Sequence, residues 1–188
     1  MNNPYFFGYG SLVNAKTHVY SSTHPAKLSG WRRVWRHNSG APQAFLSVTP
    51  DADSNIDGLI AEVPNADWKA LDLRESGYFR NALPATSLVH GAGGVDVHMY
   101  QVHLGNDAPP STDQPILLSY LDVVVQGYLE VFGEVGAARF FDTTDGWDTP
   151  ILNDRSAPIY PRSQTLSAAQ STFVDDHLSS LGAQLFSR

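Results

Sequence analysis

Two short segments of the chain combine residue types that could do chemistry, and the first is rich in glycine. Gly8-Tyr9-Gly10-Ser11-Leu12 follows an aromatic run typical of a strand that leads into a turn. Glycines permit backbone torsions that aim successive N–H groups into one cavity, which suits an anion or a developing oxyanion. The alternative is a tight turn that binds nothing. The segment lacks the third glycine of a dinucleotide fingerprint, and no G-x-S-x-G nucleophile elbow occurs anywhere in the chain.

The second segment places a carboxylate on the apolar side of an expected helix. Glu75 lies four residues after Leu71, so both side chains share one helical face. A carboxylate directed at a core must be paired, hydrogen-bonded or kept partly neutral, and this is how a general base with a raised pKa arises. The alternative is an ion pair with Arg74, Arg80 or another arginine. Of the four glutamates in the chain, only Glu75 combines this position with a neighbouring tyrosine.

A third group of candidates lies in the segment 142–164, which is rich in Asp, Thr and Pro and predicts a long ordered loop. Arg155 and Arg162 in this loop could bind a carboxylate through two parallel hydrogen bonds, or could tie the loop down. The residue pattern alone favours neither role.

Other clusters do not predict a site. The spacing of Asp142, Asp145 and Asp148 is not that of an EF-hand, and the histidines form no H-E-x-x-H motif, so we expect no metal. The basic and aromatic segment Trp31–His37 could contact single-stranded nucleic acid. A strand whose arginines meet aspartates is the simpler interpretation, because no second basic cluster follows.

The elements that must position these residues are predicted by hydrophobic periodicity and turn residues. Strands come first, one short helix interrupts them, and two longer helices follow, so the order indicates an α+β fold rather than alternating βαβ units. The expected strands are 5–10, 26–38, 43–49, 59–63, 78–89 and 95–104. The expected helices are 65–76 with Asn65 as N-cap, one starting near Gln114, and one starting at the capping box Ser167–Gln170.

Composition sets outer limits on the function. The chain has 188 residues, 42% of them hydrophobic, which is enough for one folded domain with a core. A formal charge of −7 argues against general binding to nucleic acid or to an anionic membrane. There are no cysteines, which excludes disulfides and a cysteine nucleophile. With no apolar run of membrane-spanning length, we expect a soluble cytoplasmic protein.

Four segments together resemble the γ-glutamylcyclotransferase superfamily, which includes ChaC-like and AIG2-like proteins. Tyr5–Leu12 is similar to the family's N-terminal Y-G-S-L loop, and Leu28–Trp31 to its second strand. Gly58–Val63 followed by Leu73–Arg80 resembles the strand and helix that lead to an acidic residue and a tyrosine. The helix around Tyr120 resembles a later helix whose tyrosine lines the pocket, although the serine spacing differs. The resemblance spans about residues 5–135.

The resemblance implies a small closed mixed β-barrel with peripheral helices, formed by residues 1–188 as one domain with 142–188 as a loop and helix extension. It also implies a pocket between the Y-G-S-L loop and the acid. The reaction implied is cyclisation of a γ-glutamyl group to 5-oxoproline with release of an amine or amino acid, with no cofactor or metal.

In that reaction Glu75 would be the general acid and base, and backbone N–H groups of Tyr9, Gly10, Ser11 and Leu12 would bind a carboxylate or oxyanion. Further substrate-binding roles are expected for Tyr78, Tyr120 and Arg155, with Arg162 as the other arginine that could meet a carboxylate. The alternatives are a binding module that retains a small acid without turnover, or another acyl-transfer or amide-cleaving activity. The partner is a small γ-glutamyl compound whose leaving group, like the oligomeric state, the sequence leaves open.

Overall fold

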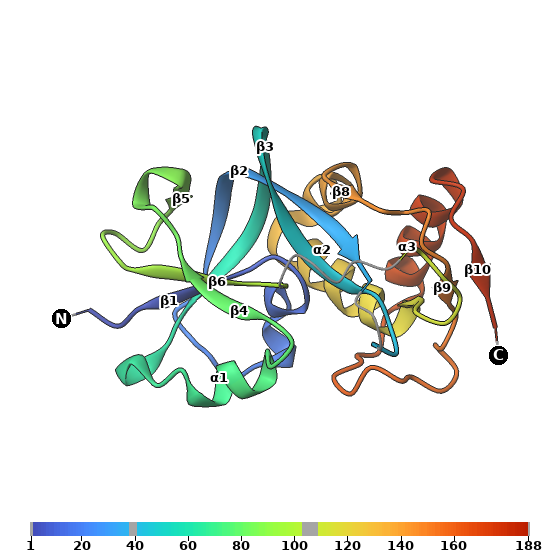
Figure 1. Cartoon of the computed structure of the whole chain (residues 1–188), viewed down its shortest axis with the longest axis horizontal. Helices are drawn as coiled ribbons and strands as arrows, with labels where there is room; N and C mark the ends of the chain where they lie inside the picture. Colours follow the sequence, from blue (N-terminus) through green and yellow to red (C-terminus); the bar gives the residue numbers. More distant parts are fainter. Residues whose placement is uncertain (1, 38–40, 103–108, 188) are drawn as a thin grey trace.

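A computed structural model describes residues 2–37, 41–102 and 109–187. Its strands and helices confirm the α+β arrangement (Figure 1). The strands are β1 (Tyr5–Gly8), β2 (His24–Arg36), β3 (Phe45–Glu62), β4 (Phe79–Ala82), β5 (Leu88–His90), β6 (Val97–Gln101), β7 (Ile116–Leu117), β8 (Thr144–Asp145), β9 (Ile151–Leu152) and β10 (Leu185–Phe186). The α-helices are α1 (Lys69–Arg74), α2 (Leu118–Asp142) and α3 (Ala168–Ser180), and short 3₁₀ turns cover Ser11–Val13, Ala15–Thr17, Pro64–Ala66 and Ala85–Ser87.

The main sheet is mixed. Its hydrogen-bonded order in the described part of the chain is β4-β6-β1-β3-β2-β5, with β8 paired to β2. β1 pairs in parallel with β6 and antiparallel with β3, and the long β2–β3 ribbon is antiparallel. A second sheet has the order β10-β9-β7. No pairing joins β4 to β5 among the described residues, so the sheet is not closed, and the expected closed barrel is not confirmed.

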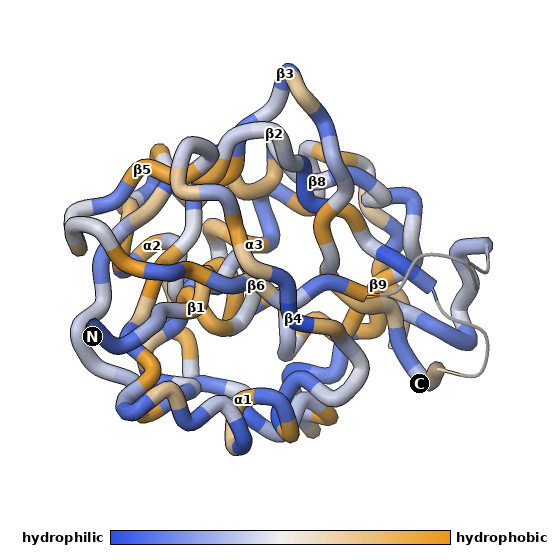
Figure 2. The backbone as a smooth tube through the Cα atoms, turned by 60° about the vertical axis from the view of Figure 1, so that its left-hand side comes forward, coloured by the Kyte–Doolittle hydropathy of each residue, from blue (hydrophilic) through white to orange (hydrophobic). Residues whose placement is uncertain are grey.

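The core lies on both faces of β1, because successive side chains of a strand point to opposite sides of a sheet. Phe7 packs into the larger cluster with residues of α2 such as Tyr128. Phe6 packs into a smaller cluster with Leu71 of α1. In the hydropathy view, orange segments follow β1, β6 and α2 through the interior (Figure 2). The end of β1 therefore lies between two helices that cover opposite faces of the sheet.

The first expected helix is shorter than predicted. α1 covers only Lys69–Arg74, and Asn65 is not its N-cap: this residue has φ 57° inside a separate 3₁₀ turn that starts at Pro64. An asparagine tolerates the left-handed region better than most residues, so the chain turns there instead of starting the helix. The helical hydrogen bond from Glu75 N–H to Leu71 C=O is nevertheless present, at 2.9 Å.

Several expected strand boundaries also change. The expected strand 78–89 is divided into β4 and β5, because Pro84 and the 3₁₀ turn at Ala85–Ser87 interrupt it. The expected strands 43–49 and 59–63 are the two ends of β3, whose centre at 51–54 bulges opposite Gly30 (Figure 1). Residues 38–40 of the expected turn and 103–104 of the expected strand 95–104 lie outside the described residues.

The C-terminal part was predicted more accurately. A helix starts near Gln114, but it begins at Leu118 after the two-residue β7, and it continues across a break at Gly133 to Asp142. The expected loop 142–164 contains the short strands β8 and β9. The capping box at Ser167 and Gln170 is confirmed, with both of its reciprocal hydrogen bonds present. Segment 31–36 is a strand as expected, and Arg32 pairs with an aspartate, Asp145, at 2.7 Å. The expectation that its arginines meet local aspartates is not met there, because Asp145 is distant in sequence and Arg33 bonds to hydroxyl and carbonyl oxygens.

The loop after β1 is fixed to α2 by a contact that only glycine permits. The Asn14 side chain donates to the Val123 carbonyl at 2.9 Å. At Gly127, one turn further along α2, a Cβ atom would lie 2.7 Å from the Asn14 backbone nitrogen. No contact that short occurs between real atoms of these types, so an added methyl group must push the loop away from the helix.

Replacing Gly127 with alanine should therefore lower the free energy of unfolding by about 1–3 kcal/mol, the usual cost of overpacking. In an ordinary helix the same change stabilises by about 1 kcal/mol. Urea unfolding followed by circular dichroism measures the difference. Gly94→Ala is the matched control, since Gly94 is exposed and has nothing within 4 Å of the added Cβ. A Gly127→Ala variant as stable as the unchanged protein would contradict this account of the loop.

Candidate active site

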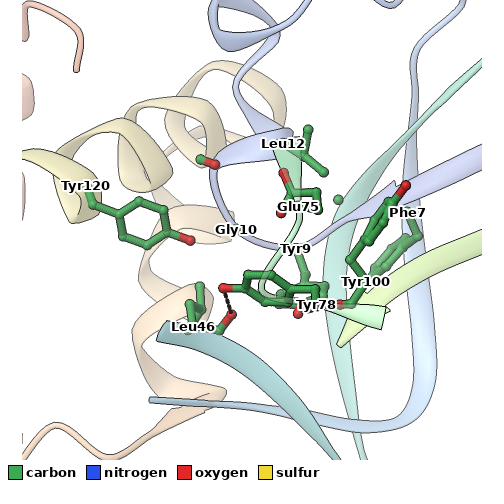
Figure 3. A pocket seen from close by; sticks show the side chains of 11 residues that line it. Phe7, Tyr9, Gly10, Leu12, Leu46, Glu75, Tyr78, Tyr100 and Tyr120 are labelled. Atoms are coloured by element: carbon green, nitrogen blue, oxygen red, sulfur yellow. Dashed lines mark hydrogen bonds between the residues drawn. The ribbon is translucent and has the colours of Figure 1, made fainter. Parts of the chain in front are cut away.

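A small recess of about 30 Å³ opens beside the loop that follows β1 (Figure 3). The loop, the strands β1, β3 and β6, the end of α1 and the start of α2 all contribute residues to its wall. The lining residues are Phe7, Gly8, Tyr9, Gly10, Ser11, Leu12, Leu46, Glu75, Tyr78, Tyr100 and Tyr120. Segments distant in sequence thus meet at one place.

A larger cavity of about 200 Å³ continues from the recess. The two share Ser11, Leu46, Glu75, Tyr78 and Tyr120, so we treat them as the inner and outer parts of one site. The additional residues of the outer cavity are Gln43, Ala44, Phe45, Arg74, Leu117, Tyr160, Pro161 and Arg162. Seven of the eight site residues predicted from the sequence therefore line one site; their roles remain predictions.

Close packing explains the second glycine of the loop. A Cβ atom on Gly10 would lie 2.7 Å from the Tyr120 hydroxyl oxygen and 3.4 Å from Leu46. Tyr120 directs its hydroxyl group toward this part of the loop (Figure 3). The Thr17 hydroxyl donates to the Ser11 carbonyl at 2.9 Å and fixes the turn from its other side. Gly10 is therefore required because the Tyr120 hydroxyl group approaches the turn closely, and the turn forms part of the wall of the recess.

Glu75 reaches the recess because α1 ends there. It is the C-cap residue of α1, and its side chain is only 15% exposed. The expectation of a carboxylate on the core side of this helix is confirmed. The ion pair offered as the alternative is also present, since Arg74 Nε lies 2.9 Å from Glu75 Oε1. Both interpretations of the sequence thus describe the same side chain.

Arg74 connects Glu75 to the loop. Besides Glu75, its guanidinium donates to the Thr17 carbonyl at 2.7 Å and to the Ser11 hydroxyl at 3.2 Å. A further bond goes to the Thr17 hydroxyl at 3.2 Å. Because the arginine is shared among three residues on two segments, it positions the carboxylate against the loop and does not simply neutralise it.

The electrostatic state of Glu75 follows from this arrangement. Burial raises the pKa of Glu75 above its ordinary value of 4.5, and the charge and hydrogen bond of Arg74 oppose the rise, as does the more distant charge of Arg162. The net pKa remains raised. A carboxyl group with a raised pKa exchanges protons more readily near neutral pH than an exposed glutamate does, which suits a group that must take up and return a proton.

Three tyrosines form the walls of the site. Burial raises the pKa of Tyr9, of Tyr78 and of Tyr120 well above the ordinary value of 10.0, so their hydroxyl groups remain protonated. The Tyr78 hydroxyl donates to the Leu46 carbonyl at 3.1 Å, the dashed bond of Figure 3. The Tyr9 hydroxyl donates to the Tyr100 carbonyl at 2.6 Å. These two bonds hold the walls to strands β3 and β6.

Arg155 is the predicted site residue that the structure places elsewhere. It lines neither part of the site. Its guanidinium makes two hydrogen bonds to Asp122 of α2, at 2.7 and 2.8 Å, and one to Asp175 of α3, at 2.7 Å. Of the two roles open to this arginine, tying the loop down is the one found. Arg162, seven residues later, lines the outer cavity.

Some lining residues were not predicted from the sequence. Phe45 and Leu46 come from the start of β3, and Tyr100 from β6, and nothing local distinguishes them from ordinary strand residues. Arg74 had a signal, because it directly precedes the candidate carboxylate. Tyr160 lies in the Asp- and Pro-rich loop, where an aromatic residue next to proline indicates order.

Neither a metal cluster nor a membrane span is found in the described part of the chain. Within residues 2–37, 41–102 and 109–187, no three side chains of His, Asp or Glu are placed to hold a metal ion. No helix in these ranges is both long and apolar enough to cross a membrane.

Residues 6–119 match the family model described as "Gamma-glutamyl cyclotransferase, AIG2-like". The chain belongs to this family. The match covers more than half of the protein and includes the loop after β1, Glu75 and Tyr78. It ends one residue before Tyr120, and it does not reach Tyr160 or Arg162. The family predicted from the four sequence segments is thereby confirmed.

Three solved structures of low sequence identity share the fold of this chain. A structure described as a gamma-glutamyl cyclotransferase has a TM-score of 0.58 at 14% identity, covering 93% of this chain and 99% of its own. The crystal structure of the human uncharacterized protein loc79017 has a TM-score of 0.56 at 13% identity, covering 93% of this chain and 99% of its own. The crystal structure of YkqA from Bacillus subtilis has a TM-score of 0.54 at 18% identity, covering 78% of this chain and 57% of its own. A search of curated proteins gave no match.

Replacing Arg74 with glutamine should raise the pKa of Glu75 further, because Arg74 is the main influence that opposes burial. A ¹³C NMR titration of glutamate-labelled protein measures this, with Glu75→Gln identifying the signal. The pKa of Glu75 is higher in the folded protein than its ordinary value of 4.5, so protonation of Glu75 adds to the free energy of unfolding. This contribution is fully present below about pH 4.5 and is lost as the pH rises through the pKa of Glu75 in the folded protein.

Lys16→Gln is the control for removing one positive charge, because Lys16 pairs with Glu130 and lines neither cavity. This variant should leave the Glu75 titration unchanged. An unchanged or lowered Glu75 pKa in Arg74→Gln would show that Arg74 does not act on the carboxylate as described.

Proposed function

We propose that the protein cyclises the γ-glutamyl group of a small substrate to 5-oxoproline. The substrate's α-amine attacks its own γ-carbonyl carbon, so that a C–N bond forms within the glutamyl group. The bond from the same carbon to the leaving nitrogen then breaks. One proton moves from the attacking nitrogen to the leaving nitrogen, and an amine or amino acid departs. All atoms come from the substrate.

The observation that carries this proposal is the buried Glu75 carboxylate, with its raised pKa, at the junction of the two cavities. Glu75 accepts a proton from the α-ammonium or from the attacking amine and returns it to the leaving nitrogen. One group can do both because its pKa lies closer to neutrality than that of an exposed glutamate. Membership of the γ-glutamyl cyclotransferase family supports the same chemistry.

The loop after β1 has the second role in the proposal. Backbone N–H groups of Tyr9, Gly10, Ser11 and Leu12 bind the substrate carboxylate or the oxyanion that develops on the γ-carbonyl. Tyr120 adds a neutral, protonated hydroxyl group over Gly10. Tyr78 closes one wall and, with the loop, keeps the glutamyl chain curled. Intramolecular attack held in this way reaches effective molarities of about 10⁵ M or more.

A second candidate is a binding module that holds a small γ-glutamyl acid without turnover. The 2.9 Å ion pair between Arg74 and Glu75 is the observation that favours it, because a carboxylate used only to anchor Arg74 would have the same geometry. The position of Glu75 at the junction of the two cavities favours the enzyme, since a carboxylate that only anchors Arg74 has no need to line a cavity.

Release of 5-oxoproline from a panel of γ-glutamyl compounds tests the proposal. The panel contains glutathione, γ-glutamyl amino acids, γ-glutamyl-lysine amines and a carrier-bound γ-glutamyl group, with the product quantified by mass spectrometry. The unchanged protein should turn over at least one compound. Glu75→Gln should lower kcat by about 10²–10⁴-fold, the usual contribution of a general acid–base group.

Glu134→Gln is the matched control, because Glu134 is exposed on α2 and lines neither cavity. It should retain full activity, and both variants should unfold at the temperature of the unchanged protein within a few degrees. Full activity of Glu75→Gln would refute the role of Glu75. Thermal stabilisation by a panel compound without any 5-oxoproline would favour the binding module.

A further inference from the structure

Residues 153–163 form a strap that contributes Tyr160, Pro161 and Arg162 to the wall of the outer cavity. The family match ends at residue 119, so this segment lies outside the part of the chain that the family model describes. The strap therefore contributes to the outer cavity three residues that the family match does not include.

The strap is held rigidly by two neighbouring residues. The Asp154 carboxylate is buried and accepts hydrogen bonds from the Ser119 N–H at 2.8 Å, the Ser119 hydroxyl at 2.6 Å and the Ile159 N–H at 2.9 Å. Arg155 then attaches the strap to Asp122 and Asp175. The strap is thus fixed to the first turn of α2, close to Tyr120, and its position does not depend on a ligand.

Arg162 is the cation of the outer cavity that remains available. Arg74, the other arginine there, is already bonded to Glu75, Thr17 and Ser11. The half-buried Arg162 side chain forms no hydrogen bond and no ion pair within the described residues, and its charge acts on Glu75 only across the cavity. A guanidinium group that lines a cavity without a partner is suited to a bidentate carboxylate.

The rest of the outer cavity is aromatic and small. Tyr160 packs its ring edge to face on Tyr120, with centroids 5.0 Å apart, and Phe45 packs in the same manner on Tyr78 at 6.0 Å. The volume of about 200 Å³ is below the roughly 300–1,000 Å³ of pockets for drug-sized ligands. An occupant of amino-acid size fits this volume, with a carboxylate directed at Arg162 and a side chain against the rings.

We propose that the strap forms the leaving-group subsite and that Arg162 determines its specificity, by selecting leaving groups that carry a carboxylate over neutral ones of the same shape. This inference rests on the proposed cyclotransferase function. It assigns Glu75 and the loop after β1 to the glutamyl half of the substrate, and Arg162 with Tyr160 to the departing half.

A matched pair of substrates tests the proposal. γ-Glutamyl-phenylalanine and γ-glutamyl-phenylalaninamide differ only in the carboxylate of the leaving group. The unchanged protein should turn over the acid with a kcat/KM about 10–100-fold above that of the amide, the value of a hydrogen bond to a charged group. In Arg162→Gln the ratio of the two kcat/KM values should fall to about 1, mainly through a higher KM for the acid; the effect of the lost charge on the pKa of Glu75 acts on both substrates alike and cancels in this ratio.

Two further variants make the test specific to the guanidinium group. Arg162→Lys keeps the positive charge but cannot form two parallel hydrogen bonds to a carboxylate, so its preference for the acid over the amide should be intermediate. Arg32→Gln removes a positive charge at the ion pair with Asp145, outside both cavities, and should leave the preference unchanged. Thermal unfolding of each variant verifies that the fold is intact. The guanidinium group of Arg162 forms no hydrogen bond within the described residues, and the bond from the Gln164 side chain goes to the Arg162 backbone carbonyl, so the substitution should not alter the melting temperature.

Equal turnover of acid and amide by the unchanged protein would overturn the inference and leave the proposed function standing. Equal losses for both substrates in Arg162→Gln would also overturn it. If no compound yields 5-oxoproline, the cyclotransferase proposal fails, and calorimetric binding of the same pair then decides on Arg162. Tighter binding of the acid that disappears in Arg162→Gln would support the carboxylate subsite, and equal binding or no binding would refute it.

Discussion

The site depends on the close contact between the loop after β1 and helix α2. The Tyr128 hydroxyl donates to the Tyr9 carbonyl at 3.0 Å, and Asn14 bonds to the Val123 carbonyl one turn earlier on the helix. Gly127 lets the two backbones approach without a side chain between them. Because Tyr120 begins the same helix, docking the loop also places the tyrosine hydroxyl over Gly10. One packing contact thus fixes the glycine turn, a wall of the recess and the approach of the strap.

The three arginines near the site differ in the groups that they contact. Arg74 is bonded to three residues and joins Glu75 to the loop, so that the carboxylate is buried without being fully neutralised. The charge and hydrogen bond of Arg74 favour the ionised form of Glu75, and burial opposes it, with the net result that the pKa of Glu75 is raised. Arg155 is bonded to two aspartates and acts only on the loop. Arg162 alone among these three arginines faces a cavity without a partner.

The division of the site follows the division of the chain. The proposed glutamyl half rests on β1, its loop and α1, which lie almost entirely within the residues that the family model matches. The proposed leaving-group half rests on the strap, which follows α2. A family that shares one reaction on different substrates would keep the first part and vary the second, since the first contacts the reacting atoms and the second only the group that departs.

The sequence by itself determined the local features. It predicted the turn at Gly8 and Gly10, the capping box at Ser167, and a carboxylate on the buried side of a helix four residues after Leu71, because torsion preferences and helical spacing are properties of neighbouring residues. The tertiary structure decided the rest. Whether the sheet closes depends on pairings between distant strands, and the bonding of Arg155 to Asp122 and Asp175, while Arg162 faces the cavity, depends on residues 20–40 positions away. Two arginines seven residues apart look alike in a sequence, and only the packing of helices α2 and α3 against the strap gives them different partners.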